Sequence, residues 1–413
     1  MTVSCRRLFL VSPFYFLKTH KQIAINGLFG KLFLLQVPRQ VLIVPDKFKG
    51  SLPAREAAGA IACGWAAACP GDTLSLLPMS DGGDGFGRVM ASALSLEEQV
   101  FEGINAAGQA RQAAWWLDAE SGQAVVETAQ SNGLALLPRG RFHPFDLDTR
   151  GVGTLLLAAG QGGATQCLAG IGGSATNDGG FGMARSLGWV FRDLRGKAID
   201  RWSELDCLAS IQAPTKQTWP SVKVASDVQN PLLGIDGATR VFGPQKGMRP
   251  GDFVKADACL GRLAKVAAEM LGSDFSLTPG AGAAGGLGFG MMAFTGAAIE
   301  PGFDVFANAT NLEMKIGVAD LVVTAEGAID EQTLMGKGTG QVATLCRRLG
   351  KPCIGLAGQL TLGKEHGNAA ETLFQRLAAI VPDLAGETEA MADAATHLER
   401  LAKQEAKLST FNT

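Results

Sequence analysis

The stretch Val41–Ala54, VLIVPDKFKGSLPA, predicts how the first part of the chain folds. Its four opening residues are apolar, which is typical of a short buried strand, and that strand ends at Pro45. A helix is expected from Pro53 to Ala68, with Ser51 as its N-cap and Pro53 near its first turn. A strand followed directly by a helix is the repeating unit of parallel α/β sheets.

The same alternation recurs at both ends of the chain. Further strands are expected at 73–77, 320–324, 352–357 and 376–381, and further helices at 86–94, 340–349 and 388–407. Alternating strands and helices predict a parallel, doubly wound sheet. The predicted fold class is therefore α/β.

The middle of the chain, roughly 97–300, has a different pattern. It predicts antiparallel strands at 109–117 and 123–128, a helix at 151–159, a strand at 166–169 and a helix at 181–186. Because 413 residues are too many for one ordinary hydrophobic core, we interpret this part as a second α/β domain inserted into the first. The predicted organisation is an N-terminal extension at 1–39, a sheet domain at 40–97 and 301–413, and an inserted domain at 98–300.

The net charge is −2, but the charges are unevenly distributed. Residues 1–40 hold six basic residues and no acidic one, which leaves the rest of the chain with a net charge of −8. A body this acidic argues against a nucleic-acid partner. The eight cysteines form no CxxC pair and show no metal-ligand spacing with the four histidines. This pattern favours buried thiols in a reducing compartment, and we expect the cytoplasm.

The N-terminal segment contains an apolar stretch at 8–17, interrupted by Pro13. It is too short to span a bilayer, so no membrane partner is expected. The basic residues before it would fit a signal peptide, and the absence of acids would fit a mitochondrial presequence, although no clear cleavage site follows. We favour an extension that activity does not need, and expect deletion of residues 1–37 to leave activity intact.

Ligands of open parallel sheets bind outside the carboxyl ends of the strands. In this chain that rule selects the segments 46–49, 81–84 and 326–330, and Gly358. The inserted domain is expected to close over this edge and form a cleft. Before the first helix, Lys47 and Lys49 favour an anion site. After the next strand, Asp81 and Asp84 lie among glycines and suit Mg²⁺, or one of them suits a general base.

The segment Gly170–Gly180, GIGGSATNDGG, follows an expected strand and opens an expected helix. Its backbone amides and hydroxyls are suited to holding phosphate groups. It also fits a loose dinucleotide-binding fingerprint, with Asp193 eighteen residues after Ala175. A nicotinamide-dependent dehydrogenase of a small hydroxy acid is therefore an alternative, although one loose fingerprint supports it only weakly.

Two further loops carry charged candidates. Asp227 follows an expected strand, and Lys246 lies in a loop rich in glycine and proline, where a flexible lysine has little structural use. Glu326 and Asp330 follow a later strand, and Lys337 precedes a helix. The Walker A pattern and the protein-kinase motifs are absent from the sequence, which excludes those two nucleotide-binding classes.

Ten segments, taken in order from about residue 40 to 360, resemble the glycerate kinase family. They read VLIVPDKFKGSLPA, LPMSDGGDG, AVVETAQSNGL, TRGVGTLLLAA, GIGGSATNDGGFGM, SDVQNPLLG, GATRVFGPQKG, PGAGAAGGLGFG, TAEGAID with QT and GK after it, and KPCIGLAGQL. The resemblance implies a flavodoxin-like parallel sheet domain with an inserted second α/β domain. It also implies ATP, Mg²⁺ and glycerate as ligands.

The expected activity is phosphorylation of D-glycerate by ATP with release of ADP. The resemblance alone favours 2-phosphoglycerate as the product, and a glycerate 3-kinase stays open. A non-enzymatic alternative is a sugar-acid binding protein whose two domains clamp their ligand. The oligomeric state, a homodimer included, also stays open.

The expected roles of individual residues follow from what phosphoryl transfer needs. Catalytic roles are expected for Asp81, Lys49, Lys246 and Asp227. Asp81 and Asp84 are expected to hold Mg²⁺, unless one of them deprotonates the attacking hydroxyl. The two lysines would neutralise the substrate carboxylate or the phosphoryl oxygens. The residues expected to bind ATP lie in two loops: Gly172, Gly173, Ser174, Thr176, Asn177, Asp178, Glu326, Asp330 and Lys337.

Overall fold

The computed structural model describes residues 37–336, 338–362, 370 and 372–410. Residues 38–413 form one compact unit, distinct from residues 1–37. The expectations for residues 1–36 therefore lie outside the described residues, and the same holds for Lys337.

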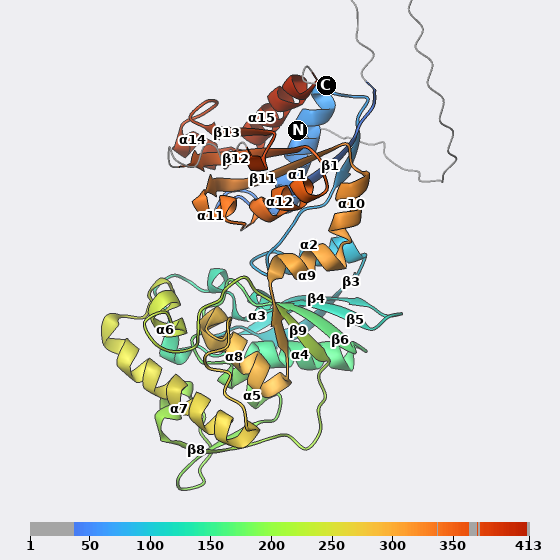
Figure 1. Ribbon diagram of the computed structural model, residues 1–413. Coiled ribbons are helices and arrows are strands. Elements are labelled where there is room, and N and C mark those ends of the chain that lie inside the picture. The colour runs from blue at the N-terminus through green and yellow to red at the C-terminus, as the bar shows by residue number, and fades with distance from the viewer. Residues whose placement is uncertain (1–36, 337, 363–369, 371, 411–413) are drawn as a thin grey trace, which may run out of the picture. The chain divides into compact units, whose positions relative to one another are not determined.

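A sheet of five parallel strands carries the two ends of this unit (Figure 1). Its strands are β1 (Gln40–Pro45), β2 (Thr73–Leu76), β11 (Leu321–Asp330), β12 (Cys353–Thr361) and β13 (Arg376–Val381). Across the sheet they lie in the order β13-β12-β11-β1-β2. Across the sheet from the β2 edge, the strands are the second, first, third, fourth and fifth of this sheet in chain order. Flavodoxin-like folds have the same strand order. The predicted parallel, doubly wound sheet is confirmed.

Strand β1 is buried on both faces, which explains its continuous apolar run. The helices that cover the sheet include α1 (Ala54–Ala68), α15 (Ala394–Ser409) and α12 (Thr339–Arg348). Val41 and Ile43 pack in the core with α1 and α15, whereas Leu42 and Val44 pack in the core that α12 enters. Figure 1 shows α1 and α15 on one side of the sheet and α12 on the other.

A second sheet has six strands in the order β10-β9-β6-β5-β4-β3. Its strands are β3 (Glu97–Ile104), β4 (Ala110–Asp118), β5 (Gln123–Glu127), β6 (Gln166–Gly170), β9 (Ser221–Ala225) and β10 (Ala298–Glu300). The pairs from β5 to β10 are parallel, and β3 and β4 are antiparallel. Side chains of this sheet share a hydrophobic core with side chains of α4 (Arg150–Gln161), α5 (Phe181–Ser186), α7 (Phe253–Leu271) and α8 (Ala283–Thr295).

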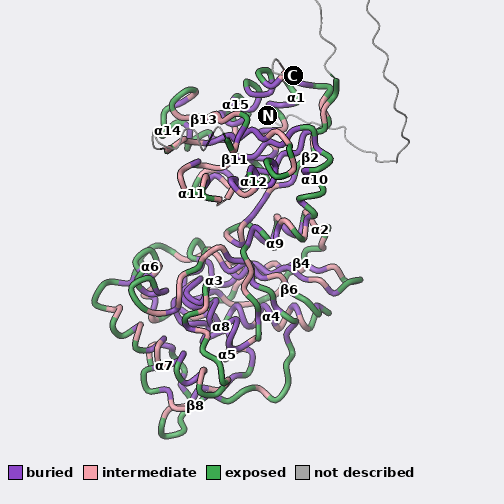
Figure 2. The backbone as a smooth tube through the Cα atoms, in the orientation of Figure 1, coloured by how far each residue is buried: buried purple, intermediate pink, exposed green. Residues whose placement is uncertain are grey.

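One hydrophobic core contains side chains of both sheets. Helices α2 (Phe86–Leu94) and α9 (Gly302–Ala309) contribute to it, together with Val44 of β1 and Trp116 of β4. Helix α2 approaches β4 so closely that a Cβ atom on Gly87 would lie 2.0 Å from the Trp116 ring. Figure 2 shows buried backbone in the strands of both sheets. The division at 98 and 300 into two domains stays a prediction.

The remaining elements are short. They are α3 (Ala129–Asn132), α6 (Ala238–Phe242), α10 (Leu312–Val318), α11 (Glu331–Leu334), α14 (Glu387–Ala392), β7 (Val190–Asp193), β8 (Leu208–Gln212) and several 3₁₀ turns. Within the described part of the chain, no helix has the length and apolar character needed to cross a bilayer. Five cysteines are buried: Cys69, Cys167, Cys259, Cys346 and Cys353.

Local expectations were wrong for the start of α1 and for the last helix. The N-cap position of α1 is Pro53, and the hydroxyl of Ser51 donates instead to the carbonyl of Phe48. The helix expected at 388–407 is two helices, α14 and α15, that meet at Asp393. Strand β3 and helix α7 were not among the expected elements. Strand β3 carries three glutamates in eight residues, which weaken its apolar pattern.

Candidate functional site

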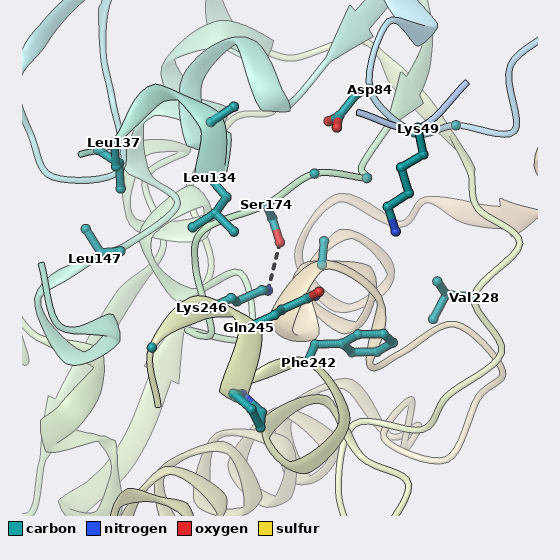
Figure 3. A pocket seen from close by; sticks show the side chains of 18 of the residues that line it. Lys49, Asp84, Leu134, Leu137, Leu147, Ser174, Val228, Phe242, Gln245 and Lys246 are labelled. Atoms are coloured by element: carbon teal, nitrogen blue, oxygen red, sulfur yellow. Dashed lines mark hydrogen bonds between the residues drawn. The ribbon is translucent and has the colours of Figure 1, made fainter. Parts of the chain in front are cut away.

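A cavity of about 1980 Å³ collects the ends of strands from both sheets. Its lining includes loops that follow β1, β2, β6 and β9, as expected for ligand sites of parallel strands. Eight predicted site residues line it: Lys49, Asp81, Asp84, Gly172, Gly173, Ser174, Asp227 and Lys246. Figure 3 shows Lys49 and Asp84 on one side of this cavity and Ser174 with Lys246 on another.

The turn after β2 brings two carboxylates to the cavity. Asp81 accepts the N–H of Gly83 at 3.1 Å, lies 3.5 Å from Nζ of Lys47, and keeps 37% of its side chain exposed. Asp84 lies against Gly173, where a Cβ atom would come within 1.8 Å of the Asp84 Oδ1 atom. The glycine therefore allows a carboxylate to approach the loop after β6 directly.

Lys47 and Asp46 add to this charge cluster. They belong to the segment 46–49 that the strand-end rule selected, although no part in catalysis or in binding ATP or Mg²⁺ was predicted for them. Burial raises the pKa of Asp46 to about 6, although the charge of Lys47 opposes the rise. Burial works against the charged form of Lys47, but the carboxylates of Asp81 and Asp46 outweigh it and raise the Lys47 pKa. Their signal in the sequence was their place directly after β1, at the point where the strand order reverses.

Asp227 lies in the loop after β9 and reaches the same cavity. Its Oδ1 atom accepts the N–H of Gly302, at the start of α9, at 2.6 Å. Burial raises the Asp227 pKa, while the hydrogen bond from Gly302 opposes this and the charge of Asp81 adds to it. A carboxylate with a raised pKa is a better proton acceptor than an exposed one.

Lys246 is almost completely buried, with 6% of its surface exposed. Its Nζ atom donates to the Ser174 hydroxyl at 2.9 Å and to the Thr176 carbonyl at 2.6 Å. Burial lowers the Lys246 pKa to about 7, although the charge of Asp178 opposes this. The lysine sits beside Gly285, where a Cβ atom would lie 1.9 Å from the Thr176 carbonyl oxygen and 2.8 Å from the Lys246 Nζ atom.

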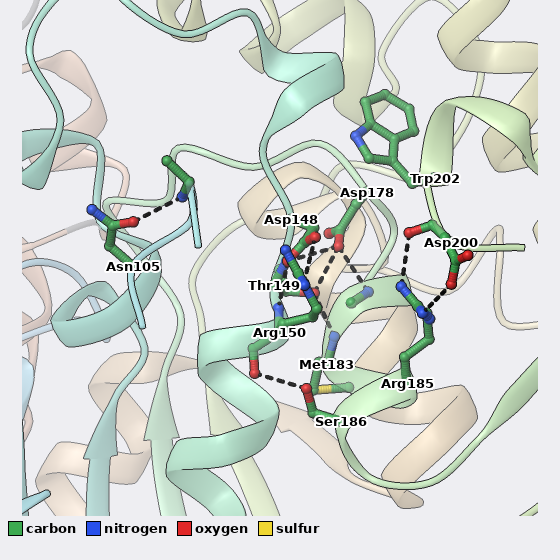
Figure 4. Close-up of polar contacts among 12 residues, drawn as sticks. Asn105, Asp148, Thr149, Arg150, Asp178, Met183, Arg185, Ser186, Asp200 and Trp202 are labelled. Atoms are coloured by element: carbon green, nitrogen blue, oxygen red, sulfur yellow. Dashed lines mark hydrogen bonds and ion pairs between the residues drawn. The ribbon is translucent and has the colours of Figure 1, made fainter. Parts of the chain in front are cut away.

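The second half of the loop after β6 turns into the protein interior (Figure 4). Asp178 is fully buried and accepts four hydrogen bonds, from the N–H and hydroxyl of Thr149 and from the N–H groups of Gly180 and Gly182. Burial raises the Asp178 pKa to about 6, and the charge of Asp148 adds to this. Asp178 thus connects the N-terminal ends of α4 and α5.

Two more predicted ATP-binding residues of this loop face other side chains. Asn177 donates to the Thr239 hydroxyl at 3.1 Å, and the Thr176 hydroxyl accepts from Asn132 at 3.4 Å. All three of Thr176, Asn177 and Asp178 are buried and do not line the cavity. Their part in binding ATP stays a prediction, which would require them to act through the backbone or through their neighbours.

Glu326 and Asp330 do not line the cavity either. They were expected to follow a strand, but β11 is longer than expected, so Glu326 lies within it and Asp330 is its last residue. Glu326 accepts the hydroxyls of Thr333 and Thr339 at 2.8 and 2.6 Å, and burial raises its pKa to about 7 against these hydrogen bonds. Asp330 caps α11 by accepting the N–H groups of Gln332 and Thr333. Their contact with ATP stays a prediction.

Comparison with known proteins agrees with the sequence resemblance. A family model described as the glycerate kinase family matches residues 41–410. The chain belongs to the glycerate kinase family. The predicted family and the prediction of an enzyme are confirmed, and the fold class agrees with a solved structure of the family.

Three relatives in the glycerate kinase family show how far the similarity extends. A glycerate kinase of Halalkalibacterium halodurans is 37% identical over 376 residues, which cover 90% of this chain and 98% of the relative. A glycerate 2-kinase of Escherichia coli is 37% identical over 83% of this chain and 91% of the relative. A crystal structure described as glycerate kinase 2 from Salmonella typhimurium matches with a TM-score of 0.78 and 34% identity, covering 91% of this chain and 99% of that one.

Membership of the glycerate kinase family removes the dehydrogenase alternative, and the structure explains why its fingerprint was misleading. Asp193 lies at the end of β7, where it accepts the N–H groups of Arg195 and Lys197 in a tight turn. It does not line the cavity that Gly172 and Gly173 reach. Asp193 therefore stabilises a turn, and its spacing from Ala175 has no connection with nucleotide binding.

Part of the cavity lining was not predicted from the sequence. The segment 134–147 contributes apolar side chains and arginines, and a 3₁₀ turn contributes Arg249. These residues follow no strand directly, so the strand-end rule did not select them. The only signal was an arginine pair, Arg139 and Arg141, in a loop with proline and glycine.

Proposed function

We propose that the chain transfers a phosphoryl group from ATP to the 2-hydroxyl of D-glycerate, forming 2-phosphoglycerate and ADP. Family membership supports the kinase reaction, and the relative named glycerate 2-kinase supports the 2-position. The observation that carries the proposal is one cavity whose lining includes, among other residues, Lys49, Lys246, Asp81, Asp84, Asp227 and the glycine loop Gly172–Ser174. Phosphoryl transfer needs this combination of charge neutralisation and positioning.

Lys49 is our candidate for binding the glycerate carboxylate. Its side chain extends into the cavity in Figure 3, and it forms no ion pair with any described residue. Lys47, by contrast, is already held by Asp81 at 3.5 Å. Lys49 has no acidic partner, so it is available to the carboxylate of a hydroxy acid. An aspartate of the same cavity that accepts a proton would bind the hydroxyl at the other end, and the two contacts together would orient the substrate.

Asp227 is our candidate for the residue that accepts the hydroxyl proton. Its hydrogen bond from Gly302 fixes one carboxylate oxygen, and burial raises its pKa. The carboxylate has more lone pairs than the N–H groups of Gly302 and Phe303 use, so it can also accept the substrate hydroxyl. Asp81 is the alternative base, because it lines the same cavity and keeps part of its carboxylate exposed.

Mg²⁺ fits the pair Asp81 and Asp84 when it arrives with the nucleotide. No group of three or more acidic, histidine or cysteine side chains among the described residues could hold a metal alone. Mg²⁺ is commonly held by one or two carboxylates together with substrate phosphates. The missing Cβ atom at Gly173 leaves room for Asp84 next to the glycine loop. The ion would neutralise phosphate oxygens.

Lys246 and the loop Gly172–Ser174 are our candidates for holding the transferred phosphoryl group. Lys246 is positioned by Ser174 and by the Thr176 carbonyl, so its third N–H is the one available to a ligand. A negatively charged phosphoryl group nearby would favour the charged form of this buried lysine.

The product distinguishes the proposal from its alternatives. The purified chain, with ATP, Mg²⁺ and D-glycerate, is coupled to enolase without phosphoglycerate mutase. Enolase signal is expected, because enolase consumes 2-phosphoglycerate directly. Signal that requires added mutase would instead establish a glycerate 3-kinase, and ADP release that fails to depend on D-glycerate would reject glycerate as the substrate.

A further inference from the structure

One wall of the cavity is apolar and has no part in the chemistry proposed above. Leu134, Leu137, Phe142 and Leu147 line it, and Leu134 is 37% exposed although it is a large apolar side chain. Figure 3 shows Leu134, Leu137 and Leu147 on the side of the cavity away from Lys49 and Asp84. An apolar wall in a polar cavity is typical of a site for a flat, apolar part of a ligand.

This wall is joined directly to the glycine loop. The N–H of Leu134 donates to the Gly173 carbonyl at 2.8 Å, and Gly133 forms a bridge with Ser174. Behind it, Leu147 packs against Ala175, which belongs to the same loop. The apolar wall is therefore held at a fixed position relative to the backbone amides that would receive phosphates.

The loop that continues the wall is cationic. Arg139 and Arg141 are exposed, line the cavity, and form no ion pair with any residue of the described chain. The acidic side chain nearest them in sequence that lines this wall, Asp146, is paired with Arg201 at 2.5 Å. The wall thus keeps a net positive charge, whereas Asp81, Asp84 and Asp227 make the other side acidic. Unpaired guanidinium groups suit phosphate oxygens.

We propose that this wall, formed by Leu134, Leu137, Leu147, Arg139 and Arg141, binds the nucleotide. The adenine ring packs on Leu134 and Leu137, which Leu147 supports from behind, the distal phosphates reach the glycine loop, and the arginines hold phosphate oxygens. D-glycerate then occupies the opposite side, between Lys49 and Asp227. The cavity has room for two ligands, since about 1980 Å³ exceeds the roughly 300–1,000 Å³ of a pocket for one small molecule. The identity of the nucleotide rests on the proposed function.

Calorimetry on the full chain without glycerate tests the arginines and the leucines separately. The probes are ADP, adenosine and inorganic tripolyphosphate. The double variant Arg139→Ala/Arg141→Ala is expected to weaken ADP and tripolyphosphate binding about tenfold or more and to leave adenosine binding unchanged. Leu134→Ala is expected to weaken adenosine and ADP binding about threefold to tenfold and to leave tripolyphosphate unchanged.

Two controls match these variants. Arg195→Ala removes an exposed arginine and Leu277→Ala an exposed leucine, and neither residue lines the cavity. Both should bind all three probes as the unmodified chain does. Because the substituted side chains are exposed, thermal unfolding should be unchanged in all variants, and unchanged adenosine binding by the arginine variant shows that its cavity is intact.

Steady-state kinetics give the deciding contrast. The arginine variant should raise KM for ATP about tenfold and change KM for D-glycerate less than twofold. The reverse result, a raised KM for D-glycerate with normal ADP binding, would overturn the proposal and place the hydroxy acid on this wall. Normal binding of every probe by both variants would also overturn it. If the variants change ADP binding as expected but the unmodified chain does not phosphorylate glycerate, the proposed function is rejected. The assignment of this wall to the nucleotide then still stands.

Discussion

The loops that follow β2 and β6 have similar compositions, yet they present different groups to the cavity. Asp81 and Asp84, after β2, both line the cavity, and Asp81 keeps 37% of its side chain exposed. Asp178, after β6, has no exposed surface and accepts four hydrogen bonds from its own protein. The number of protein donors aimed at a carboxylate therefore decides whether it can serve a ligand.

The two loops also support each other. The N–H of Gly172 donates to the Gly82 carbonyl at 3.0 Å, so the glycines hold the loops together where neither has a side chain. Gly182 lets α5 approach α4, because a Cβ atom there would lie 2.7 Å from the amide nitrogens of Thr149 and Arg150. The loop after β2 thus supplies charges to the cavity, and the loop after β6 supplies the rigid support beside them.

Removing the Asp178 carboxylate should produce the largest change in stability. In Asp178→Ala, the N–H and hydroxyl of Thr149 and two glycine N–H groups lose their acceptor inside the protein. Each buried donor left unpaired costs about 1–3 kcal/mol, so we expect the free energy of unfolding to fall by about 3 kcal/mol or more. Urea denaturation followed by circular dichroism measures this. A loss below about 1 kcal/mol would mean that water replaces the carboxylate, and the contrast with Asp81 would disappear.

Asp81→Asn should have the opposite profile. We expect turnover to fall about 100-fold or more, because Asp81 is proposed to hold Mg²⁺ or to accept a proton, while the free energy of unfolding changes by less than about 1 kcal/mol. ADP release at saturating ATP and D-glycerate measures turnover. Near-normal turnover would remove Asp81 from both roles and leave Asp227 as the base.

The sequence predicted the strands and the exposed loops well because both depend on local pattern. The apolar run of β1 indicates burial on two faces, and the helices Phe86–Leu94 and Phe181–Ser186 have the expected bounds. The strand-end rule placed Asp81 and Asp84 at the cavity, and Asp227, which follows another expected strand, lines it as well. Glu326 and Asp330, which the same rule selected, do not line it. These features need only the order of residues along the chain and the geometry of parallel sheets.

The sequence could not predict which loop residues are buried, because distant segments decide it. Asp178 is buried by Thr149, which lies 29 residues earlier in the chain. The left-handed backbone of Ala284, Gly285 and Gly286 follows from the close approach of the Thr176 carbonyl to Gly285. The cavity wall at Leu134 depends in the same way on a hydrogen bond to the glycine loop. Tertiary contacts of this kind leave no pattern in a single sequence.

Gly173→Ala should change the loop after β6 so that it displaces Asp84 in the loop after β2. Its Cβ atom would lie 1.8 Å from the Asp84 Oδ1 atom, and φ is +74°. We expect turnover to fall roughly tenfold, because Asp84 must move away from the glycine loop. Gly196→Ala is the matched control: its φ is +77°, but a Cβ atom there meets nothing within 4 Å. Equal activity in the two variants would show that the contact with Asp84 has no functional part.

The last expected effect is the pH dependence of stability that Lys246 causes. Burial lowers its pKa in the folded chain to about 7 from 10.5. Between these two values the unfolded chain binds a proton that the folded chain has released, so the contribution of Lys246 to stability becomes more favourable as pH rises from about 7 toward 10.5. Below about pH 7 the lysine is charged in both states, and its contribution stays constant.

Lys246→Met keeps an unbranched apolar chain, one atom shorter than that of lysine, and removes this titration. Urea denaturation at about pH 7, 8 and 9 should show that the stability of the unmodified chain rises relative to the variant by up to about 1.4 kcal/mol per pH unit. Arg195→Ala, an exposed change away from the cavity, should leave the pH dependence unaltered. Parallel curves for the unmodified chain and Lys246→Met would contradict the expectation. Lys246 would then keep its charge in the folded state, stabilised by Ser174, the Thr176 carbonyl and nearby Asp178.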